Sequence, residues 1–275
     1  MAQTAEYLLG TSDAERARLI AQCELHRPEA EQLFDRIGIE PGWRAIDIGC
    51  GPLGVLDLLS ERVGPSGSVV GLEREPRMLD MAALSLVERH LDTVRLVQGD
   101  AAGTQLPAES FDLVHERLVL FNVSSPEDVV AEMVRLARPG GYVALQDLDI
   151  VSYTCEPPHP AWDRLVGVLI SGWRDAGLDP SIGRRLPGLL RAAGLGDVEV
   201  AAHARVLRPG DLYHTLPLYL AGILREQILA SDALTEAELD DLVRQLAAHL
   251  EQPETLVLYS TLFQAWGRKP LGGSG

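Results

Sequence analysis

Short apolar runs alternate with longer amphipathic stretches over the first half of the chain. β-rich runs occur at residues 44–48, 68–73, 94–98, 111–115 and 142–147, each separated from the next by a helical pattern or a long connection. Strands of a parallel sheet have this near-continuous apolar character because helices cover both of its faces. The pattern therefore predicts an α/β fold with a doubly wound sheet.

Helical patterns fill most of the remaining sequence. They are predicted over residues 13–37, where the apolar stripe is irregular and interrupted near Pro28, and over residues 55–62, 76–91, 127–137, 161–176, 182–194, 216–230 and 235–250. The last two strands are predicted at residues 198–206 and 256–266. Residues 211–251 form a helical insertion between these strands, and we expect it to cap the carboxyl ends of the sheet, where ligands bind in such folds.

The first strand runs into a glycine-rich turn, Gly49-Cys50-Gly51-Pro52-Leu53-Gly54, and a helix is predicted directly after it. Glycine accepts positive φ and lets the backbone approach a ligand closely. The free N–H groups at the start of the next helix point toward the same place. The turn predicts a nucleotide-type pocket, although the glycine spacing alone also matches a dinucleotide site.

An acidic residue lies at or near the end of each of the first three strands, namely Asp47, Glu73 and Asp100. We expect Asp47 to order the turn and attract a cation, Glu73 to bind two ribose hydroxyls and Asp100 to accept an adenine amino group. A pyrophosphate would be repelled by these charges. The ligand that fits is a cationic, phosphate-free adenosine compound, S-adenosylmethionine.

Five motifs resemble those of class I S-adenosylmethionine-dependent methyltransferases, and the similarity extends over nearly the whole chain. The motifs are Asp47-Ile48-Gly49-Cys50-Gly51, Gly71-Leu72-Glu73-Arg74, Gln98-Gly99-Asp100-Ala101, Phe111-Asp112-Leu113-Val114 and Arg138-Pro139-Gly140-Gly141. The chain is most similar to small-molecule methyltransferases of actinobacterial, natural-product type. The resemblance implies a Rossmann-like sheet of seven strands, with strands six and seven forming an antiparallel edge hairpin.

The resemblance also implies which residues bind the cofactor. Tyr7 would close over the cofactor's carboxylate, with packing on the sheet as the alternative. Cys50, inside the turn, is either a reactive thiol or fills a small apolar slot between sheet and helix. The implied set is Tyr7, Asp47, Gly49, Cys50, Gly51, Glu73, Arg74, Met78, Asp100, Ala101 and Glu116. Two departures stand out: Gly54 is one place away from the family's third glycine, and Asn122 stands where many relatives have a histidine.

Methyl transfer from a sulfonium requires mainly the alignment of donor and acceptor, and a base only when the nucleophile arrives protonated. The candidate catalytic residues are His115, Asp147 and His159. Each also has a structural alternative, such as a backbone hydrogen bond for His115 or a turn for the proline-flanked His159. No metal site is predicted, because Asp147 and Asp149 offer too few ligands.

Composition narrows the partners and the compartment. Forty acidic and 24 basic residues give a net charge of −16, which disfavours nucleic acids and anionic membranes as partners. Three widely spaced cysteines indicate no disulfide framework and favour a reducing cytoplasm. We expect an N-terminal helical lid at residues 1–40, a methyltransferase domain at 41–270 and a flexible tail at 271–275, in a monomer or a homodimer.

The sequence thus predicts an enzyme that methylates a small, apolar or aromatic natural-product-type molecule. One alternative is an enzyme of the same fold that keeps bound S-adenosylmethionine while it cyclises or rearranges a polyketide or prenyl substrate. A cofactor-binding regulator without activity and an NAD-dependent oxidoreductase are less favoured.

Overall fold

The computed structural model describes residues 13–271, which form two compact units. The first unit contains the described residues up to Asp147 together with residues 185–201 and 264–271. The second contains residues 148–184 and 202–263. The predicted cap, residues 211–251, belongs to the second unit, and its place over the sheet remains a prediction.

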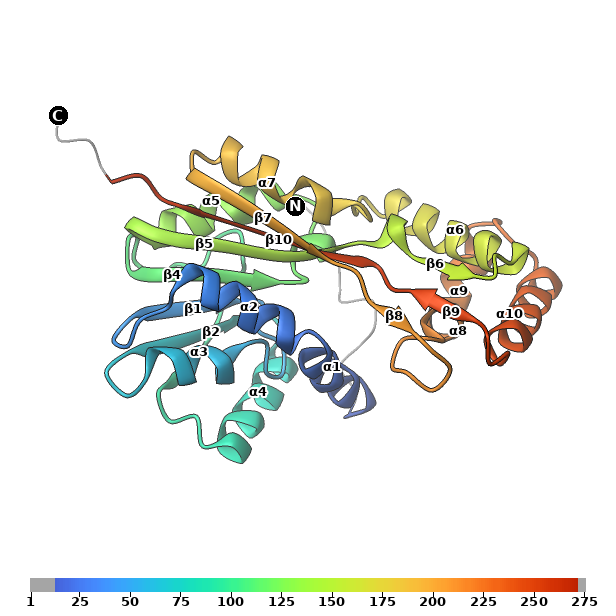
Figure 1. Cartoon of the computed structure of the whole chain (residues 1–275), viewed down its shortest axis with the longest axis horizontal. Helices are drawn as coiled ribbons and strands as arrows, with labels where there is room; N and C mark the ends of the chain where they lie inside the picture. Colours follow the sequence, from blue (N-terminus) through green and yellow to red (C-terminus); the bar gives the residue numbers. More distant parts are fainter. Residues whose placement is uncertain (1–12, 272–275) are drawn as a thin grey trace. The chain divides into compact units, whose positions relative to one another are not determined.

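A seven-stranded sheet forms the centre of the first unit (Figure 1). Its order is β3-β2-β1-β4-β5-β10-β7, and the first five strands along the chain are parallel. β10 runs antiparallel to β5, since Gly140 and Gly141 at the start of β5 exchange backbone hydrogen bonds with Lys269 after the end of β10. The edge pair β10-β7 is also antiparallel, which confirms the predicted fold class. The bounds are β1 Arg44–Ile48, β2 Ser68–Glu73, β3 Val94–Gln98, β4 Phe111–Arg117, β5 Ala137–Asp149, β7 Gly196–His203 and β10 Thr261–Arg268.

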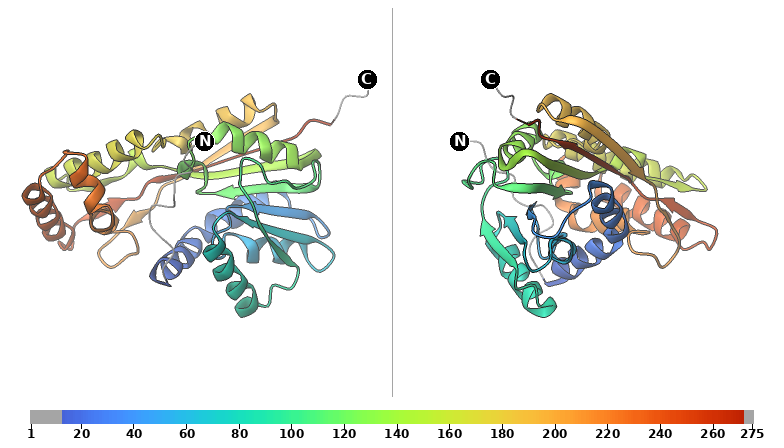
Figure 2. Two further views of the ribbon diagram at one scale, coloured as in Figure 1. Left: turned by 180° about the vertical axis from the view of Figure 1, so that it is seen from behind. Right: turned by 60° about the vertical axis from the view of Figure 1, so that its left-hand side comes forward.

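Helices cover both faces of this sheet (Figures 1 and 2). Leu33 and Phe34 of α2 pack with Leu59 of α3 in one apolar cluster over β1, β4 and β5. α4 packs against β2 and β3, and α5 packs against β4 from the other face. The bounds are α1 Asp13–Leu25, α2 Arg27–Ile37, α3 Leu56–Val63, α4 Pro76–Arg89, α5 Pro126–Leu136 and α7 Ile182–Ala192.

The helical region predicted over residues 13–37, with an interruption near Pro28, forms two helices, because the chain breaks at His26 between α1 and α2. Pro28 lies in the first turn of α2, where its missing N–H breaks no helical hydrogen bond. The two helices differ in how they are held. α2 buries Leu33, Phe34 and Ile37, whereas none of the described apolar side chains of α1 is fully buried.

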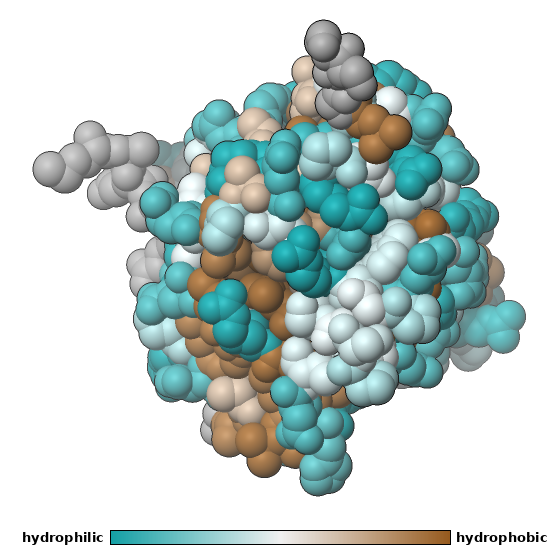
Figure 3. Space-filling view, turned by 90° about the vertical axis from the view of Figure 1, so that its left-hand side faces the viewer, coloured by the Kyte–Doolittle hydropathy of each residue, from teal (hydrophilic) through white to brown (hydrophobic). Residues whose placement is uncertain are grey.

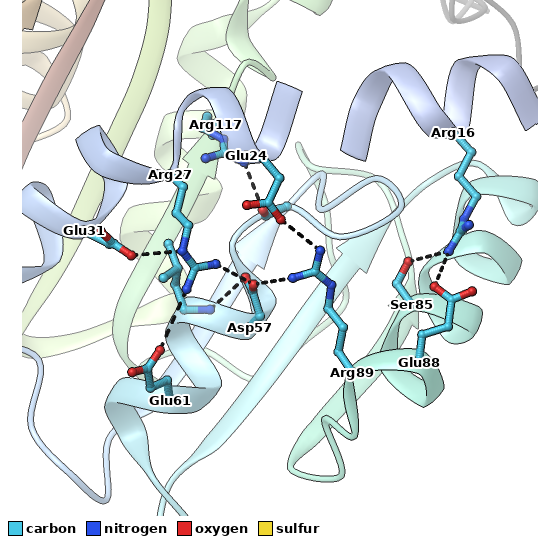
Figure 4. Close-up of polar contacts among 12 residues, drawn as sticks. Arg16, Glu24, Arg27, Glu31, Asp57, Glu61, Ser85, Glu88, Arg89 and Arg117 are labelled. Atoms are coloured by element: carbon cyan, nitrogen blue, oxygen red, sulfur yellow. Dashed lines mark hydrogen bonds and ion pairs between the residues drawn. The ribbon is translucent and has the colours of Figure 1, made fainter. Parts of the chain in front are cut away.

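Ion pairs connect α1 and α2 to the helices that follow β1 and β2 (Figure 4). Asp57 of α3 accepts from Arg27 of α2 at 2.7 Å and from Arg89 of α4 at 3.0 Å. Arg89 also pairs with Glu24 of α1 at 2.9 Å. Arg16 of α1 donates to two side chains of α4. Polar contacts therefore account for much of the attachment of α1 to the rest of the unit.

The second unit is built from helices and a three-stranded sheet of order β6-β9-β8. α6 packs against α8, α9 and α10. The predicted helix over residues 216–230 is interrupted at Leu224, and the predicted strand over residues 256–266 divides into β9 and β10. The bounds are β6 Thr154–Glu156, α6 Pro160–Asp175, β8 Val206–Leu207, α8 Leu216–Ile223, α9 Arg225–Ala230, α10 Glu236–Leu250 and β9 Leu256–Leu258.

Within residues 13–271, no helix is both long and apolar enough to cross a membrane. Cys23, Cys50 and Cys155 are all free thiols, in agreement with the sequence analysis.

On the face drawn in Figure 3, hydrophilic residues predominate, and apolar residues gather in one elongated area.

Candidate active site

The glycine-rich turn after β1 has the backbone that its sequence predicts. Gly49, Gly51 and Gly54 have φ angles of 66°, 52° and 55°, in the left-handed region that side chains disfavour. A Cβ at Gly49 would lie 2.5 Å from Val119 Cγ2, and one at Gly54 would lie 2.0 Å from Asp47 Oδ2. A Cβ at Gly51 would meet no atom within 4 Å. Two of the glycines therefore accommodate the protein itself, and Gly51 leaves open space beside the backbone.

Asp47 orders this turn from inside the sheet. Its Oδ2 accepts the Val55 N–H at 3.1 Å, at the residue that precedes α3, and its Oδ1 lies 2.7 Å from His115 Nδ1. Asp47 is only 2% exposed. It therefore shapes the turn as predicted, but its burial argues against direct contact with a cationic ligand.

His115 is the centre of a buried polar chain. Gln146 Nε2 lies 2.6 Å from His115 Nε2, and Gln146 Oε1 accepts from Gln264 Nε2 at 2.7 Å. Because the Gln146 oxygen is used in this way, its amide group donates to His115 Nε2. His115 then carries its proton on Nδ1 and donates it to Asp47. Gln264 Nε2 also donates to the Glu29 backbone carbonyl at 2.8 Å, which ends the chain at α2.

This arrangement argues against the predicted catalytic role of His115. The side chain is fully buried, both ring nitrogens are engaged, and Phe34 of α2 packs edge-on against the ring at 5.4 Å between centroids. A general base must reach the proton that it removes. We therefore assign His115 a structural function, which is to hold Asp47 in place beneath the glycine turn.

Glu73, at the end of β2, lies beside the turn. Its Oε2 accepts the Gly51 N–H at 3.0 Å, and its Oε1 accepts the N–H groups of Arg74 and Glu75 at 2.8 Å and 3.0 Å. The side chain is only half-buried. The carboxylate is thus held by the backbone at the edge of the open space by Gly51.

The other residues predicted to bind the adenosine lie around the ends of β2 and β3. Asp100 is exposed and accepts the Ala102 N–H at 2.8 Å, and Ala101 is half-buried. Met78 is buried in α4, and Arg74 pairs with Glu75 at 3.5 Å. Asp100 retains the exposure that contact with a ligand requires.

Cys50 faces the core. Its Sγ would lie 3.0 Å from a Cβ at Gly71, its side chain belongs to the apolar cluster under α2 and α3, and burial raises the pKa of the thiol well above its usual value. These contacts favour the slot-filling alternative for the side chain. Only the backbone of Cys50 is left to face a ligand.

Glu116 and Asp147 lie on the opposite face of the sheet from His115. Strand residues alternate between faces, and Glu116 follows His115 in β4 while Asp147 follows Gln146 in β5. Both carboxylates are fully buried. Burial raises the pKa of Glu116 well above its usual value, and the charge of Asp147 raises it further. Neither group reaches the surface, which argues against a direct catalytic role for Asp147.

The structure does not bring His159 into this cluster, and it does not describe Tyr7. His159 belongs to the second unit, where its Nδ1 accepts the Ala161 N–H at the start of α6 and its ring stacks on His249. Its catalytic role remains a prediction. Tyr7 lies outside the described residues.

Sequence reasoning missed several residues around the turn. Arg117 Nη2 donates to the Gly54 carbonyl at 2.9 Å, and its buried Nη1 has no hydrogen-bond partner among residues 13–271. Gln146 and Gln264 complete the chain to His115, and Val119 packs on Gly49. Polar residues inside the apolar strands β5 and β10 were the available signal for the two glutamines, but nothing in the sequence indicated their partners.

The site's donor set fits S-adenosylmethionine. Gly51 provides a place that a Cβ would fill, and Glu73 and Asp100 supply two exposed or half-buried carboxylates. Carboxylates accept hydrogen bonds from ribose hydroxyls and an adenine amino group. Among the described residues, no group of three or more His, Cys, Asp and Glu side chains could hold a metal ion.

Comparisons with known proteins support this assignment. Residues 46–145 match the family described as "Methyltransferase domain". The chain is 38% identical over 122 residues to the nocamycin O-methyltransferase of Saccharothrix syringae, which is 44% of each chain. It is 33% identical over 129 residues to the demethylmenaquinone methyltransferase of a Geobacillus species, 47% of this chain and 55% of that one. The chain thus spans about half the length of these curated relatives.

Solved structures support the fold in the same way. The arsenic(III) S-adenosylmethionine methyltransferase of Chlamydomonas reinhardtii superposes with a TM-score of 0.50 at 20% identity, covering 86% of this chain and 66% of that one. The comparisons thus show that residues 46–145 are similar to a methyltransferase domain and that the fold is that of a known methyltransferase structure.

Proposed function

We propose that the chain transfers the methyl group of S-adenosylmethionine to a small, apolar or aromatic molecule of natural-product type. The observation that carries the proposal is the Glu73 carboxylate, which accepts the Gly51 N–H at 3.0 Å beside open space. A carboxylate that can accept hydrogen bonds from the ribose hydroxyls and an accessible backbone lie side by side there. An adenosine compound without phosphates requires both. The names of the two curated relatives, which specify nocamycin and demethylmenaquinone, support a small-molecule acceptor.

Each side chain in this proposal has one task. Glu73 holds the ribose, Asp100 and Ala101 meet the adenine edge, and Arg74 and Met78 flank the adenine. Gly49 and Gly51 border the methionine tail, and Asp47 keeps their turn in shape through the Val55 N–H. The bound cofactor supplies a methyl group on a positively charged sulfur, which is a good leaving group.

Alignment is the main contribution that we assign to the protein. Holding donor and acceptor about 3 to 3.5 Å apart in line can lower the barrier by several kcal/mol. His115 and Asp147 are buried, so we assign neither as a base. Tyr7 and His159 remain proposed contacts to the cofactor and the acceptor. The acidic charge and the free thiols support a cytoplasmic setting as part of the proposal.

Calorimetry with S-adenosylmethionine tests the cofactor site. Glu73→Ala is expected to weaken binding roughly ten- to hundredfold, because charge-assisted hydrogen bonds to the ribose are lost. Glu61→Ala is the matched control, since Glu61 is an exposed acid on α3 and its removal changes the net charge equally. Equal affinities of the wild type and Glu73→Ala would contradict the proposal.

A methyl-transfer assay tests the reaction itself. The full chain is incubated with S-adenosylmethionine carrying a labelled methyl group and with panels of phenolic, quinone and polyketide acceptors. We expect label in the acceptor together with an equal amount of S-adenosylhomocysteine. An acceptor that is converted without label, while the cofactor stays intact, would favour cyclisation or rearrangement instead.

A further inference from the structure

We infer that Glu116 and Asp147 are positioning residues, which hold the turn of residues 118–122 against Gly49 and so fix the shape of the site next to the glycine turn. The inference deepens the proposed function and rests on it. Neither residue needs to touch the cofactor for this purpose, because both act through the backbone of the turn.

The two buried carboxylates capture two N–H groups of this turn. Glu116 Oε2 accepts the Val119 N–H at 3.0 Å, and Asp147 Oδ2 accepts the Phe121 N–H at 2.9 Å. Glu116 Oε1 accepts the Gln146 N–H of β5 at 3.1 Å. Glu116 thus connects the turn to the neighbouring strand. Because both carboxyl groups are fully buried, an N–H group that loses its acceptor here cannot bond to water instead, which increases the cost of losing these hydrogen bonds.

The turn needs this restraint because its backbone is strained. Leu118 has a φ of 61°, a left-handed conformation that costs a residue with a side chain about 1 to 2 kcal/mol. Its N–H donates to the Gln146 carbonyl at 2.8 Å, and its carbonyl accepts from Asn122 Nδ2 at 2.8 Å. Strain of this kind persists only where the surroundings over-determine the conformation. The two carboxylates supply the hydrogen bonds on either side of Leu120.

The turn determines what lies over the first glycine. A Cβ at Gly49 would lie only 2.5 Å from Val119 Cγ2, so Val119 already occupies the space next to the Gly49 backbone. Val119 itself is only half-buried. If the turn relaxes, Val119 moves relative to Gly49 and the wall of the methionine-tail site changes. This link joins a buried acid pair to the proposed cofactor site.

Asn122 fits the same account. It stands where many relatives have a histidine, and here its side chain caps the Leu118 carbonyl of the turn. Its side-chain nitrogen therefore stabilises the strained conformation.

Calorimetric titration of the full chain with S-adenosylhomocysteine tests the inference. Asp147→Ala is expected to weaken binding roughly tenfold, because the Phe121 N–H loses its charged acceptor. Asp147→Asn should weaken it less than about threefold, since the amide oxygen still accepts that N–H. Val119→Ala should weaken it as well. The double variant Val119→Ala/Asp147→Ala should bind S-adenosylhomocysteine about as tightly as whichever single variant binds it less tightly. The reason is that both changes act through the same contact, that of Val119 with Gly49.

Two results would overturn the inference. One is wild-type affinity in folded Asp147→Ala, and the other is additive losses in the double variant. If Asp147→Ala does not fold, Glu116→Ala, which removes the acceptor of the Val119 N–H, replaces it in the same cycle. Hydrogen exchange at the Phe121 amide gives a readout without any cofactor. We expect this amide to exchange faster in Asp147→Ala, after correction for any change in global stability. Unchanged exchange would contradict the inference. A wild type that binds no S-adenosylhomocysteine would contradict the proposed function but not this result.

Discussion

Two clusters of polar side chains, on opposite faces of β4 and β5, have different functions. On the face under α2, Asp47, His115, Gln146 and Gln264 bond to one another, and the chain ends on a backbone carbonyl. On the other face, Glu116 and Asp147 accept N–H groups from a turn. Consecutive residues of one strand thus belong to a closed structural network and to the support of the site. A shift of one residue decides which function a polar side chain has.

The largest expected effect is on stability, and it comes from a substitution that breaks the hydrogen-bond network around His115. His115→Leu leaves Asp47 Oδ1 and the Gln146 amide without partners in a place where neither reaches water. Stranding a buried carboxylate and an amide should lower the free energy of unfolding by about 3 kcal/mol. Urea denaturation measures this loss.

Asn122→Ala, which removes one hydrogen bond at an exposed side chain, should cost about 1 kcal/mol or less.

Such a result for His115 would separate structure from catalysis. In the folded variant, the displaced Asp47 should weaken cofactor binding, whereas methyl transfer at saturating S-adenosylmethionine should stay within a few-fold of the wild type. A stable His115→Leu protein that is inactive even at saturating cofactor would instead support the catalytic role that the sequence predicted.

The glycine turn offers a sharper comparison between two neighbouring positions. Gly49→Ala places a Cβ against Val119 and should destabilise the fold by about 2 kcal/mol through overpacking and left-handed strain. Gly51→Ala meets open space, so strain of about 1 kcal/mol is its only expected cost without ligand. Thermal denaturation should rank the two in this order.

At Gly51, the larger expected loss is in cofactor affinity and not in stability. If the cofactor lies beside that backbone, Gly51→Ala weakens S-adenosylmethionine binding at least tenfold while the protein stays folded. Unchanged affinity in this variant would remove Gly51 from the proposed site.

The smallest expected effect concerns pH and the buried acid pair. The pKa of Glu116 is raised, by burial first and then by the charges of Asp147 on β5 and Asp47 on β1. Above its ordinary value of 4.5, the folded state therefore binds a proton that the unfolded state releases. Stability should fall as the pH rises from that value through the raised pKa. Glu116→Gln should flatten this decline, and denaturation series at several pH values would show it. An equally steep decline in the variant would contradict the raised pKa.

The sequence revealed much of the fold because the strands are short apolar runs between clear turns. β1, β2 and β3 have the predicted bounds, residues 44–48, 68–73 and 94–98. The sequence indicated an irregularity near Pro28 but not two separate helices, because a proline in the first turn of a helix resembles one tolerated inside an irregular pattern. β5 begins earlier than predicted, since Arg138-Pro139-Gly140-Gly141 has turn composition yet continues the strand.

The site was predicted only in part. Acids at strand ends and a glycine turn are local features, and Glu73 lies where they indicate. The partners of His115 are not local, because Gln146 and Gln264 are separated by 118 positions. Without the strand register, an isolated histidine after an apolar run fits catalysis as well as a buried hydrogen bond. The difference between His115 and Glu116 becomes visible only when the occupants of each face are known.

The central claim is that the edge formed by the glycine turn and Glu73 binds S-adenosylmethionine. A crystal structure of the full chain with S-adenosylhomocysteine tests it most directly. We predict the ribose hydroxyls within hydrogen-bond distance of the Glu73 carboxylate and the methionine tail along Gly49 and Gly51. Density for the ligand at any other place, with Glu73 still bonded to the Gly51 N–H as it is here, would contradict the account.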